Sequence, residues 1–301
     1  MGDDFEDWSA AMRRGDYEAA WAVSERVLAR RDPLRRDDPA EPYHRRWVWD
    51  GRRFEGRHVL VRCYHGLGDT IQFTRYLPLL KRAAASVTLE VQPKLIPLLT
   101  GFRGVDRTIA FDPAAPSPPA ECDLEIMELA FALRARPDRT EFPYLSTAAD
   151  ARARGTIGLC WRSGDWDDRR SVPPDLLEPL TRHRCITLVA EPTTLAVLNP
   201  EGCPNEILPT AALINGTDLV ITVDTLIAHL AGALGQPTWL LLRHDADWRW
   251  GEGAERTPWY PSMRLYRQER EGDWSGPLRR IERDLAAMRR SNGGGALEAA
   301  E

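Results

Sequence analysis

The chain has 301 residues, 43% hydrophobic and 28% charged, so it can bury sizeable cores and its length predicts about two domains. Forty basic and forty-five acidic side chains give a net charge of −5, which argues against nucleic acid as a partner. No Lys/Arg tract indicates a polybasic membrane anchor. The five cysteines form no CxxC pair and lie mostly in apolar runs, as buried free thiols of a reducing cytoplasm do. With no signal segment and no run of ~20 apolar residues, we expect a cytoplasmic protein that is neither secreted nor membrane-spanning.

Residues 1–44 predict a helical hairpin followed by a connector. The stretches 5–14 and 15–33 read as two helices separated by a turn, and they are similar to the second half of a tetratricopeptide unit. The sequence contains no second copy at that period. Because a single unit cannot stack into a solenoid, we expect the hairpin to pack on the domain behind it.

From residue 58 onward, short apolar runs alternate with helical patterns. Strands are predicted at 58–63, 86–91, 123–129, 156–161, 185–190, 218–223 and 238–242, and helices at 70–84, 174–182 and 224–235. Continuous apolar strands separated by helices indicate parallel sheets covered on both faces. Two proline-rich or weakly patterned stretches divide the pattern, so we predict an α/β protein with two Rossmann-like domains, 45–153 and 154–272, and a cleft between them. Residues 291–301 look like a disordered tail.

The first loop expected at this cleft reads "YHGLGDT" and follows the strand 58–63. It fails as a dinucleotide fingerprint because Ile71 stands where the third glycine belongs, and it lacks the Gly-Lys-Ser/Thr of a P-loop. Gly66 and Gly68 instead form a loop that lets an acceptor approach Asp69. Asp69 either caps the following helix or contacts a ligand, and His65 is a second candidate base because histidine titrates near neutral pH.

The loop after strand 218–223 carries Asp224 and Thr225 at a helix start, with His229 one turn later on the same face. An acid, a hydroxyl and free helix N–H groups suit a diphosphate and its attached sugar, and the histidine could donate to an oxygen of either. The alternative is that Asp224 only caps the helix and that His229 is a half-buried side chain with a satisfied hydrogen bond.

The loop after strand 156–161 supplies Arg162, Ser163 and Arg170. Guanidinium groups suit bidentate phosphate binding, and a serine hydroxyl can add a donor. The triplet "DWD" at 165–167 formally matches a metal-binding motif of other sugar transferases. Because the match is weak and arginines flank it, we favour a metal-independent site.

Five segments together carry a family resemblance: "GLGDTIQFTRYLPLL", "VTLEVQPKLIPLL", "TDLVITVDTLIAHLAGALGQPTWLLL", "DWRW" and "PWYPSMRLYRQEREGDW". They resemble the bacterial heptosyltransferase-related glycosyltransferases of family 9 and the tetratricopeptide-linked proteins close to them. The resemblance implies a GT-B fold whose last helix, 273–290, returns to the first domain. It also implies an inverting, metal-independent sugar transfer from a nucleoside-diphosphate sugar, with an ADP-sugar favoured and no further cofactor, to a glycan or protein acceptor.

The resemblance also implies roles for single residues. It makes Asp69 the general base, Arg170 a contact of the donor phosphate, and Asp224, Thr225 and His229 donor-binding residues. The chain departs from the family at Tyr64-His65, and at Glu191, which we expect at a ribose hydroxyl. Peripheral association with a membrane stays open, and the sequence predicts no oligomeric state. The departures at Tyr64-His65 and Glu191 favour a rival hypothesis, in which the protein is an inactive GT-B scaffold or a nucleotide-sugar-binding protein that acts through protein contacts.

Overall fold

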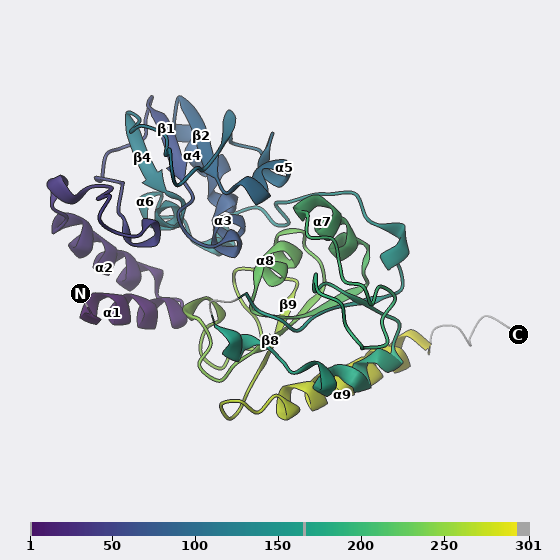
Figure 1. The fold of residues 1–301 in the computed structure, drawn as a ribbon. Helices are drawn as coiled ribbons and strands as arrows, with labels where there is room; N and C mark the ends of the chain where they lie inside the picture. The colour runs from purple at the N-terminus through teal and green to yellow at the C-terminus, as the bar shows by residue number, and fades with distance from the viewer. Residues whose placement is uncertain (1, 165–166, 294–301) are drawn as a thin grey trace, which may run out of the picture.

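The computed structural model describes residues 2–164 and 167–293, and it contains two parallel sheets. The first sheet has the order β3-β2-β1-β4 and the second the order β6-β5-β7-β8-β9. The strands are β1 His58–Arg62, β2 Ser86–Val91, β3 Arg107–Ala110, β4 Cys122–Glu125, β5 Ile157–Cys160, β6 Cys185–Thr187, β7 Leu219–Val223, β8 Thr238–Leu242 and β9 Met263–Arg267. Each sheet forms the centre of its own lobe (Figure 1). The prediction of an α/β chain with two Rossmann-like sheets is therefore confirmed.

Helices connect and cover the strands of both sheets. They are α1 Gly2–Arg13, α2 Tyr17–Ala29, α3 Leu67–Phe73, α4 Leu77–Ala83, α5 Ile96–Leu99, α6 Leu129–Ala132, α7 Ile207–Gly216, α8 Leu226–Ala233 and α9 Ser275–Gly293. Within the described ranges, no helix is both long and apolar enough to cross a membrane. The stretch expected as a tail lies, from residue 294 on, outside the described residues.

A strand is present at every predicted place, although the strand predicted at 123–129 ends at Glu125 and is followed by a 3₁₀ turn, and two further strands, β3 and β9, were not predicted. The predicted helix 70–84 is divided into α3 and α4 by a 3₁₀ turn. Pro78 is the second residue of α4, where its ring suits the first turn of a helix. The predicted helix 174–182 is a 3₁₀ helix, η9 Pro174–Arg182. Pro179 lies inside η9 and cannot donate a backbone hydrogen bond, which works against a regular α-helix.

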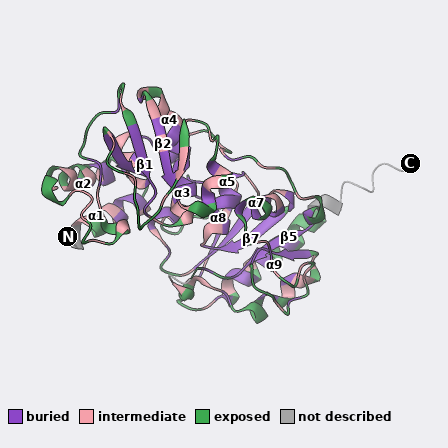
Figure 2. Ribbon diagram, turned by 45° about the horizontal axis from the view of Figure 1, so that its top comes forward, coloured by how far each residue is buried: buried purple, intermediate pink, exposed green. Residues whose placement is uncertain are grey.

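The strands form the buried centre of each lobe, and most of their residues are buried (Figure 2). All five cysteines are free and buried, as predicted. Charged groups also lie in the first core: Arg62 at the end of β1 is fully buried, and its guanidinium lies 3.2 Å from Glu90 and 3.4 Å from Asp123. Both carboxylates are themselves buried, so this end of the first sheet is held by a buried ion network rather than by apolar contacts alone.

The N-terminal hairpin contacts both lobes. From α2, Trp21 is buried in the first lobe, and the neighbouring Arg31 forms an ion pair with Glu128 at 2.7 Å. From α1, the Trp8 ring packs edge-on against Trp248 of the second lobe, with 4.8 Å between centroids. The hairpin therefore packs on the domain behind it, as expected, and it also reaches the other domain.

The last helix, α9, differs from the expectation that 273–290 returns to the first domain. Its main contacts are with β9 and η9 of the second lobe. Ile281 is fully buried there, and Asp284 accepts a hydrogen bond of 3.0 Å from the Tyr266 hydroxyl of β9. Figure 1 shows α9 lying along the second lobe, so the helix expected to return to the first domain instead covers the edge strand β9 of its own domain.

Candidate active site between the two sheets

Helices α3 and α8 pack against each other where the two lobes meet. Each follows the carboxyl end of a central strand, β1 for α3 and β7 for α8. Gly68, the second residue of α3, lies directly against the His229 ring of α8. A Cβ atom placed on Gly68 would lie 2.6 Å from His229 Cδ2 and 3.3 Å from Nε2. Gly68 thus allows the two helices to approach each other, rather than only opening the loop for an acceptor.

Asp69 has partners on both carboxylate oxygens. Oδ2 accepts the backbone N–H of Gly66 at 2.9 Å, which caps the start of α3. Oδ1 accepts a hydrogen bond from Nη2 of Arg249, which belongs to the other lobe. The capping interpretation is therefore confirmed, and the second partner of Asp69 is an arginine of the other lobe, whereas contact with a ligand stays a prediction.

Arg249 is the cation at the centre of the site, and it comes from the 3₁₀ helix η10 Trp248–Trp250. Besides Asp69, it donates to Gln72 Oε1 at 2.6 Å through Nε and to Asp247 Oδ1 at 2.8 Å through Nη1. Burial disfavours its charge, but Asp247 and Asp69 raise the pKa of Arg249 above its ordinary value. Arg249 therefore stays cationic and joins carboxylates of the two lobes.

His229 is buried, with 6% of its surface exposed. A hydrogen bond of 2.9 Å joins its Nδ1 to the hydroxyl of Tyr260, and the ring lies 5.6 Å from that of Trp250. Burial, and then the nearby cations Arg249, Arg75 and Arg170, lower the pKa of His229 well below 6.5. The imidazole is therefore neutral at pH 7, as the interpretation of a satisfied histidine expected, although it is more deeply buried than that interpretation had it.

Asp224 and Arg170 meet at the carboxyl end of β7. Arg170 Nη1 donates to the backbone oxygen of Asp224 at 3.1 Å and lies 4.0 Å from its Oδ2. Burial raises the pKa of Asp224, an effect that Arg170 and Arg249 oppose. Thr225 is the N-cap residue of α8, and its side chain makes no capping hydrogen bond. The arginine and the start of α8 therefore lie together, as the phosphate-site prediction requires.

His65 belongs to the same group of residues. Its Nδ1 forms a hydrogen bond of 2.9 Å with Glu125 Oε1, and 29% of the His65 side chain is exposed. Burial would lower the pKa of His65, but the bond to Glu125 and the charges of Glu125 and Asp69 outweigh it and raise the pKa above 6.5. Glu125 itself is 3% exposed and stands at the end of β4, next to β1.

The remaining predicted donor residues lie at the ends of β5 and β6. Arg162 Nη1 and Glu191 Oε1 form an exposed ion pair at 2.7 Å. Both line a cavity of about 640 Å³ whose walls include Trp161, Val172, Pro173, Val189 and Pro192. Ser163 is different: its hydroxyl donates to the backbone oxygen of Asp167 at 2.9 Å and lies 3.0 Å from the Ser171 hydroxyl. Ser163 therefore shapes the loop instead of offering a free donor.

Of the "DWD" triplet, residues 165 and 166 lie outside the described residues. The remaining carboxylate, Asp167, forms ion pairs with Arg169 at 2.8 Å and Arg243 at 2.5 Å. Within 2–164 and 167–293, no group of three or more His, Cys, Asp or Glu side chains is arranged to hold a metal ion.

Solved structures with a similar fold are glycosyltransferases. The glycosyl transferase family 9 protein from Veillonella parvula DSM 2008 gives a TM-score of 0.56 at 13% identity, covering 76% of this chain and 96% of that chain. E. coli ADP-heptose lps heptosyltransferase II gives 0.56 at 14% identity, covering 78% and 99%. E. coli heptosyltransferase WaaC with ADP-2-deoxy-2-fluoro heptose gives 0.52 at 13% identity, covering 76% and 99%. The chain has the GT-B fold of glycosyltransferase family 9.

Sequence comparison adds one curated relative. Protein FlbA of Caulobacter vibrioides (strain ATCC 19089 / CIP 103742 / CB 15) is 26% identical over 298 residues, which cover 79% of this chain and 48% of FlbA. The chain thus spans about half the length of this curated relative. No family model matches the chain.

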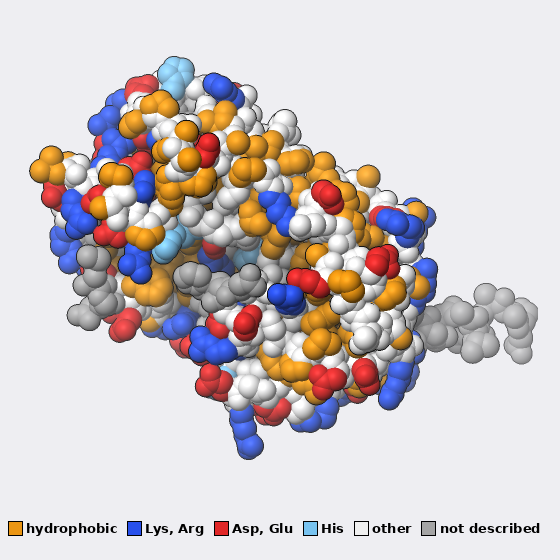
Figure 3. Space-filling view, viewed as in Figure 1, with side chains coloured by type: hydrophobic (Ala, Val, Ile, Leu, Met, Phe, Trp, Pro, Cys, Tyr) orange, Lys and Arg blue, Asp and Glu red, His pale blue; other side chains and the backbone are white. Residues whose placement is uncertain are grey.

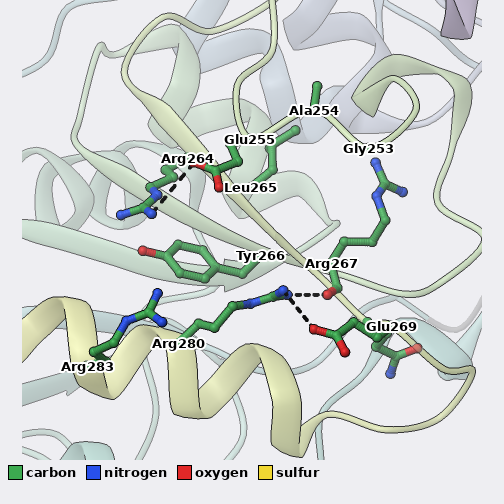
Figure 4. A pocket seen from close by; sticks show the side chains of 11 residues that line it. Gly253, Ala254, Glu255, Arg264, Leu265, Tyr266, Arg267, Glu269, Arg280 and Arg283 are labelled. Carbon is green, nitrogen blue, oxygen red and sulfur yellow. Dashed lines mark hydrogen bonds and ion pairs between the residues drawn. The ribbon is translucent and has the colours of Figure 1, made fainter.

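A second cavity of the protein, of about 260 Å³, lies between β9 and α9 in the second lobe (Figure 4). Four arginines line it, but carboxylates balance most of their charge. Arg264 forms an ion pair with Asp284 at 2.7 Å, and Arg280 forms one with Glu269 at 3.2 Å. Over the face seen in Figure 3, acidic and basic side chains are likewise mixed, in keeping with the small net charge.

Three site residues were not predicted from the sequence: Arg249, Tyr260 and Glu125. The first two lie inside "DWRW" and "PWYPS", segments that carried the family resemblance without any assigned role. Glu125 is the last residue of β4, but the predicted strand ran on to residue 129, so the rule that ligands bind at the carboxyl ends of parallel strands pointed past it.

Proposed function

We propose that the protein is a metal-independent, inverting glycosyltransferase that uses a nucleoside-diphosphate sugar. One observation carries the proposal: the carboxyl ends of the central strands of both sheets meet, with Asp69 and His65 on one side and Arg170 and Asp224 on the other. A base and a cationic phosphate site facing each other across two domains are what an inverting transfer needs.

The donor diphosphate would bind Arg170 and the start of α8, where Thr225 and the first N–H groups of the helix are free of side-chain caps. The nucleoside would enter the cavity beside Arg162 and Glu191, and Glu191 would accept from a ribose hydroxyl. Because its ring is buried and bonded to Tyr260, His229 would pack beneath the start of α8 without contacting the donor directly.

We favour an ADP-sugar, with heptose as one sugar to test. The support is that two similar structures are named for ADP-heptose or contain an ADP-sugar analogue. The acceptor would be a hydroxyl of a glycan or a protein. We place the reaction in the cytoplasm, with peripheral contact to a membrane where the acceptor is lipid-linked.

A second candidate, an inactive GT-B scaffold, is favoured by one observation. Both oxygens of Asp69 already have partners, one of them Arg249 from the other domain, so the residue that matches the family's base is not free in this conformation. A scaffold could bind a nucleotide sugar without transferring the sugar.

Thermal-shift titration with ADP-heptose, ADP-glucose, UDP-glucose, GDP-mannose and CDP-glucose tests the proposal, followed by measurement of nucleoside diphosphate release. We expect one donor to raise Tm, and Arg170→Gln to abolish that shift. Arg169→Gln is the matched control, since Arg169 is exposed and paired with Asp167. A donor that binds but is never turned over supports a nucleotide-sugar-binding protein, and no shift with any donor refutes the transferase in favour of a scaffold that acts through protein contacts.

A further inference from the structure

We propose, resting on the transferase function above, that His65 is the general base of the reaction, that Glu125 is its positioning residue, and that Asp69 acts instead as a clasp between the two domains. The inference depends on which atoms of the two candidate bases are already engaged.

Asp69 is poorly placed to take a proton. Its Oδ2 is held by the Gly66 N–H and its Oδ1 by the guanidinium of Arg249. Proton transfer to either oxygen would neutralise the carboxylate, which weakens both of these hydrogen bonds and leaves Arg249, which is 9% exposed, without one of its negatively charged partners. The energetic cost opposes general-base catalysis by Asp69.

His65 has the opposite arrangement. Its Nδ1 is bonded to Glu125, and among the described residues no hydrogen bond engages its Nε2. Because a carboxylate can only accept, the Nδ1 carries the hydrogen and Nε2 keeps the lone pair that a base needs. A carboxylate behind an imidazole fixes its tautomer and stabilises the imidazolium that forms, as in other acyl and group transfers.

The structure holds Glu125 firmly for this role. It is buried, its Oε2 accepts from the Met127 N–H at 2.7 Å, and its Oε1 also accepts from the Tyr64 N–H at 3.3 Å. On the other side, the backbone oxygen of His65 accepts from Gln92 Nε2 at 2.7 Å. Both members of the pair are therefore fixed by β4, β1 and β2 rather than by a mobile loop.

The step balances within the site. The acceptor hydroxyl gives its proton to His65 Nε2 while its oxygen forms a bond to the anomeric carbon of the donor. The bond from that carbon to the diphosphate oxygen breaks, and its electron pair leaves with the nucleoside diphosphate, whose added charge faces Arg170. The charged groups that face His65 are Glu125 and Asp69, which favour its protonation, and Arg249, which opposes it.

The test measures release of ADP from ADP-heptose, with water as acceptor, for His65→Ala, Glu125→Gln and Asp69→Asn between pH 5 and 9. We expect His65→Ala to keep the donor-induced Tm shift and lose about 100-fold or more in kcat, the usual range for a general base. Asp69→Asn should lose less than tenfold, since Asn still caps the helix. His58→Ala is the matched control, an exposed histidine at the start of β1, whereas His65 follows the end of that strand, and it should leave kcat unchanged.

Glu125→Gln gives a readout that simple structural damage would not produce. Removing its charge lowers the pKa of His65, so the acid limb of the pH–kcat profile should move to lower pH, and the NMR titration of the His65 ring should move with it. An unchanged titration, or loss of turnover in Asp69→Asn but not in His65→Ala, overturns the proposal while leaving the transferase standing. ADP-heptose that neither binds nor reacts, with every other donor also inactive, overturns the transferase and this inference together.

Discussion

Replacing Gly68 by alanine tests the contact on which the interdomain site depends. The added Cβ would lie 2.6 Å from Cδ2 of His229, closer than real Cβ contacts. The ring cannot easily move, because it is buried and bonded to Tyr260. Overpacking of this kind costs about 1–3 kcal/mol, and the higher helix propensity of alanine returns up to about 1 kcal/mol.

Gly276→Ala is the matched control. Gly276 is also the second residue of a helix, α9, and a Cβ there would have no heavy atom within 4 Å. The difference in the free energy of unfolding between the two variants should therefore equal the strain term, about 1–3 kcal/mol. Urea unfolding measures it, and combining Gly68→Ala with His229→Ala should relieve most of it. Equal effects of the two single alanines would refute the close contact between α3 and α8.

Three further outcomes follow from burial and charge. The pKa of His229 lies well below 6.5 in the folded state, so the free energy of unfolding should fall, relative to that of His229→Gln, by up to about 1.4 kcal/mol for each pH unit below 6.5. Urea unfolding at pH 7, 6 and 5 measures it, and the same pH dependence in both proteins would show that the ring is not buried. Arg62→Met should cost about 3–5 kcal/mol because it leaves the buried Glu90 without its arginine, while Asp123 keeps its ion pair with Arg36; Arg57→Met, in an exposed ion pair, should cost less than about 1 kcal/mol. Trp8→Ala should lower Tm and speed hydrogen exchange in α1, because it removes the contact with the second lobe. Phe5→Ala, at a side chain 66% exposed, should change little. Similar effects of the two substitutions would show that the hairpin does not link the lobes through Trp8.

The central strands could be predicted from the sequence because they are buried on both faces and read as continuous apolar runs. The strands that were missed, β3 and β9, each lie at the edge of a sheet. An edge strand has one neighbour and tolerates polar residues, and both β3 and β9 begin or end with exposed or half-buried arginines. Their short, mixed sequences therefore carry little strand signal.

The site was predictable one loop at a time, but its assembly was not. The pattern placed Asp69 and Asp224 in loops that follow strands, where ligands bind in parallel sheets, and His229 one helical turn later. The bond from Arg249 to Asp69 joins residues 180 positions apart, and the contact between Gly68 and His229 depends on how two separately folded sheets dock. Periodicity describes each element's own buried face and contains no information about such docking.

The position of the N-terminal hairpin changes how the two domains are linked. Because α9 packs on the second lobe, the hairpin is one link between the domains: its Arg31 pairs with Glu128 of the first lobe, and its Trp8 packs on Trp248 of the second. The connector between the domains is a second link, and it is bonded to the second lobe by Tyr144 N–H to the Ala233 oxygen at 3.1 Å and by Asp150 N–H to the Ala212 oxygen at 2.8 Å. Two pinned links, together with the Arg249–Asp69 clasp, resist wide opening of the cleft. The donor should therefore enter through the exposed cavity beside Arg162, which can fill without separating the lobes.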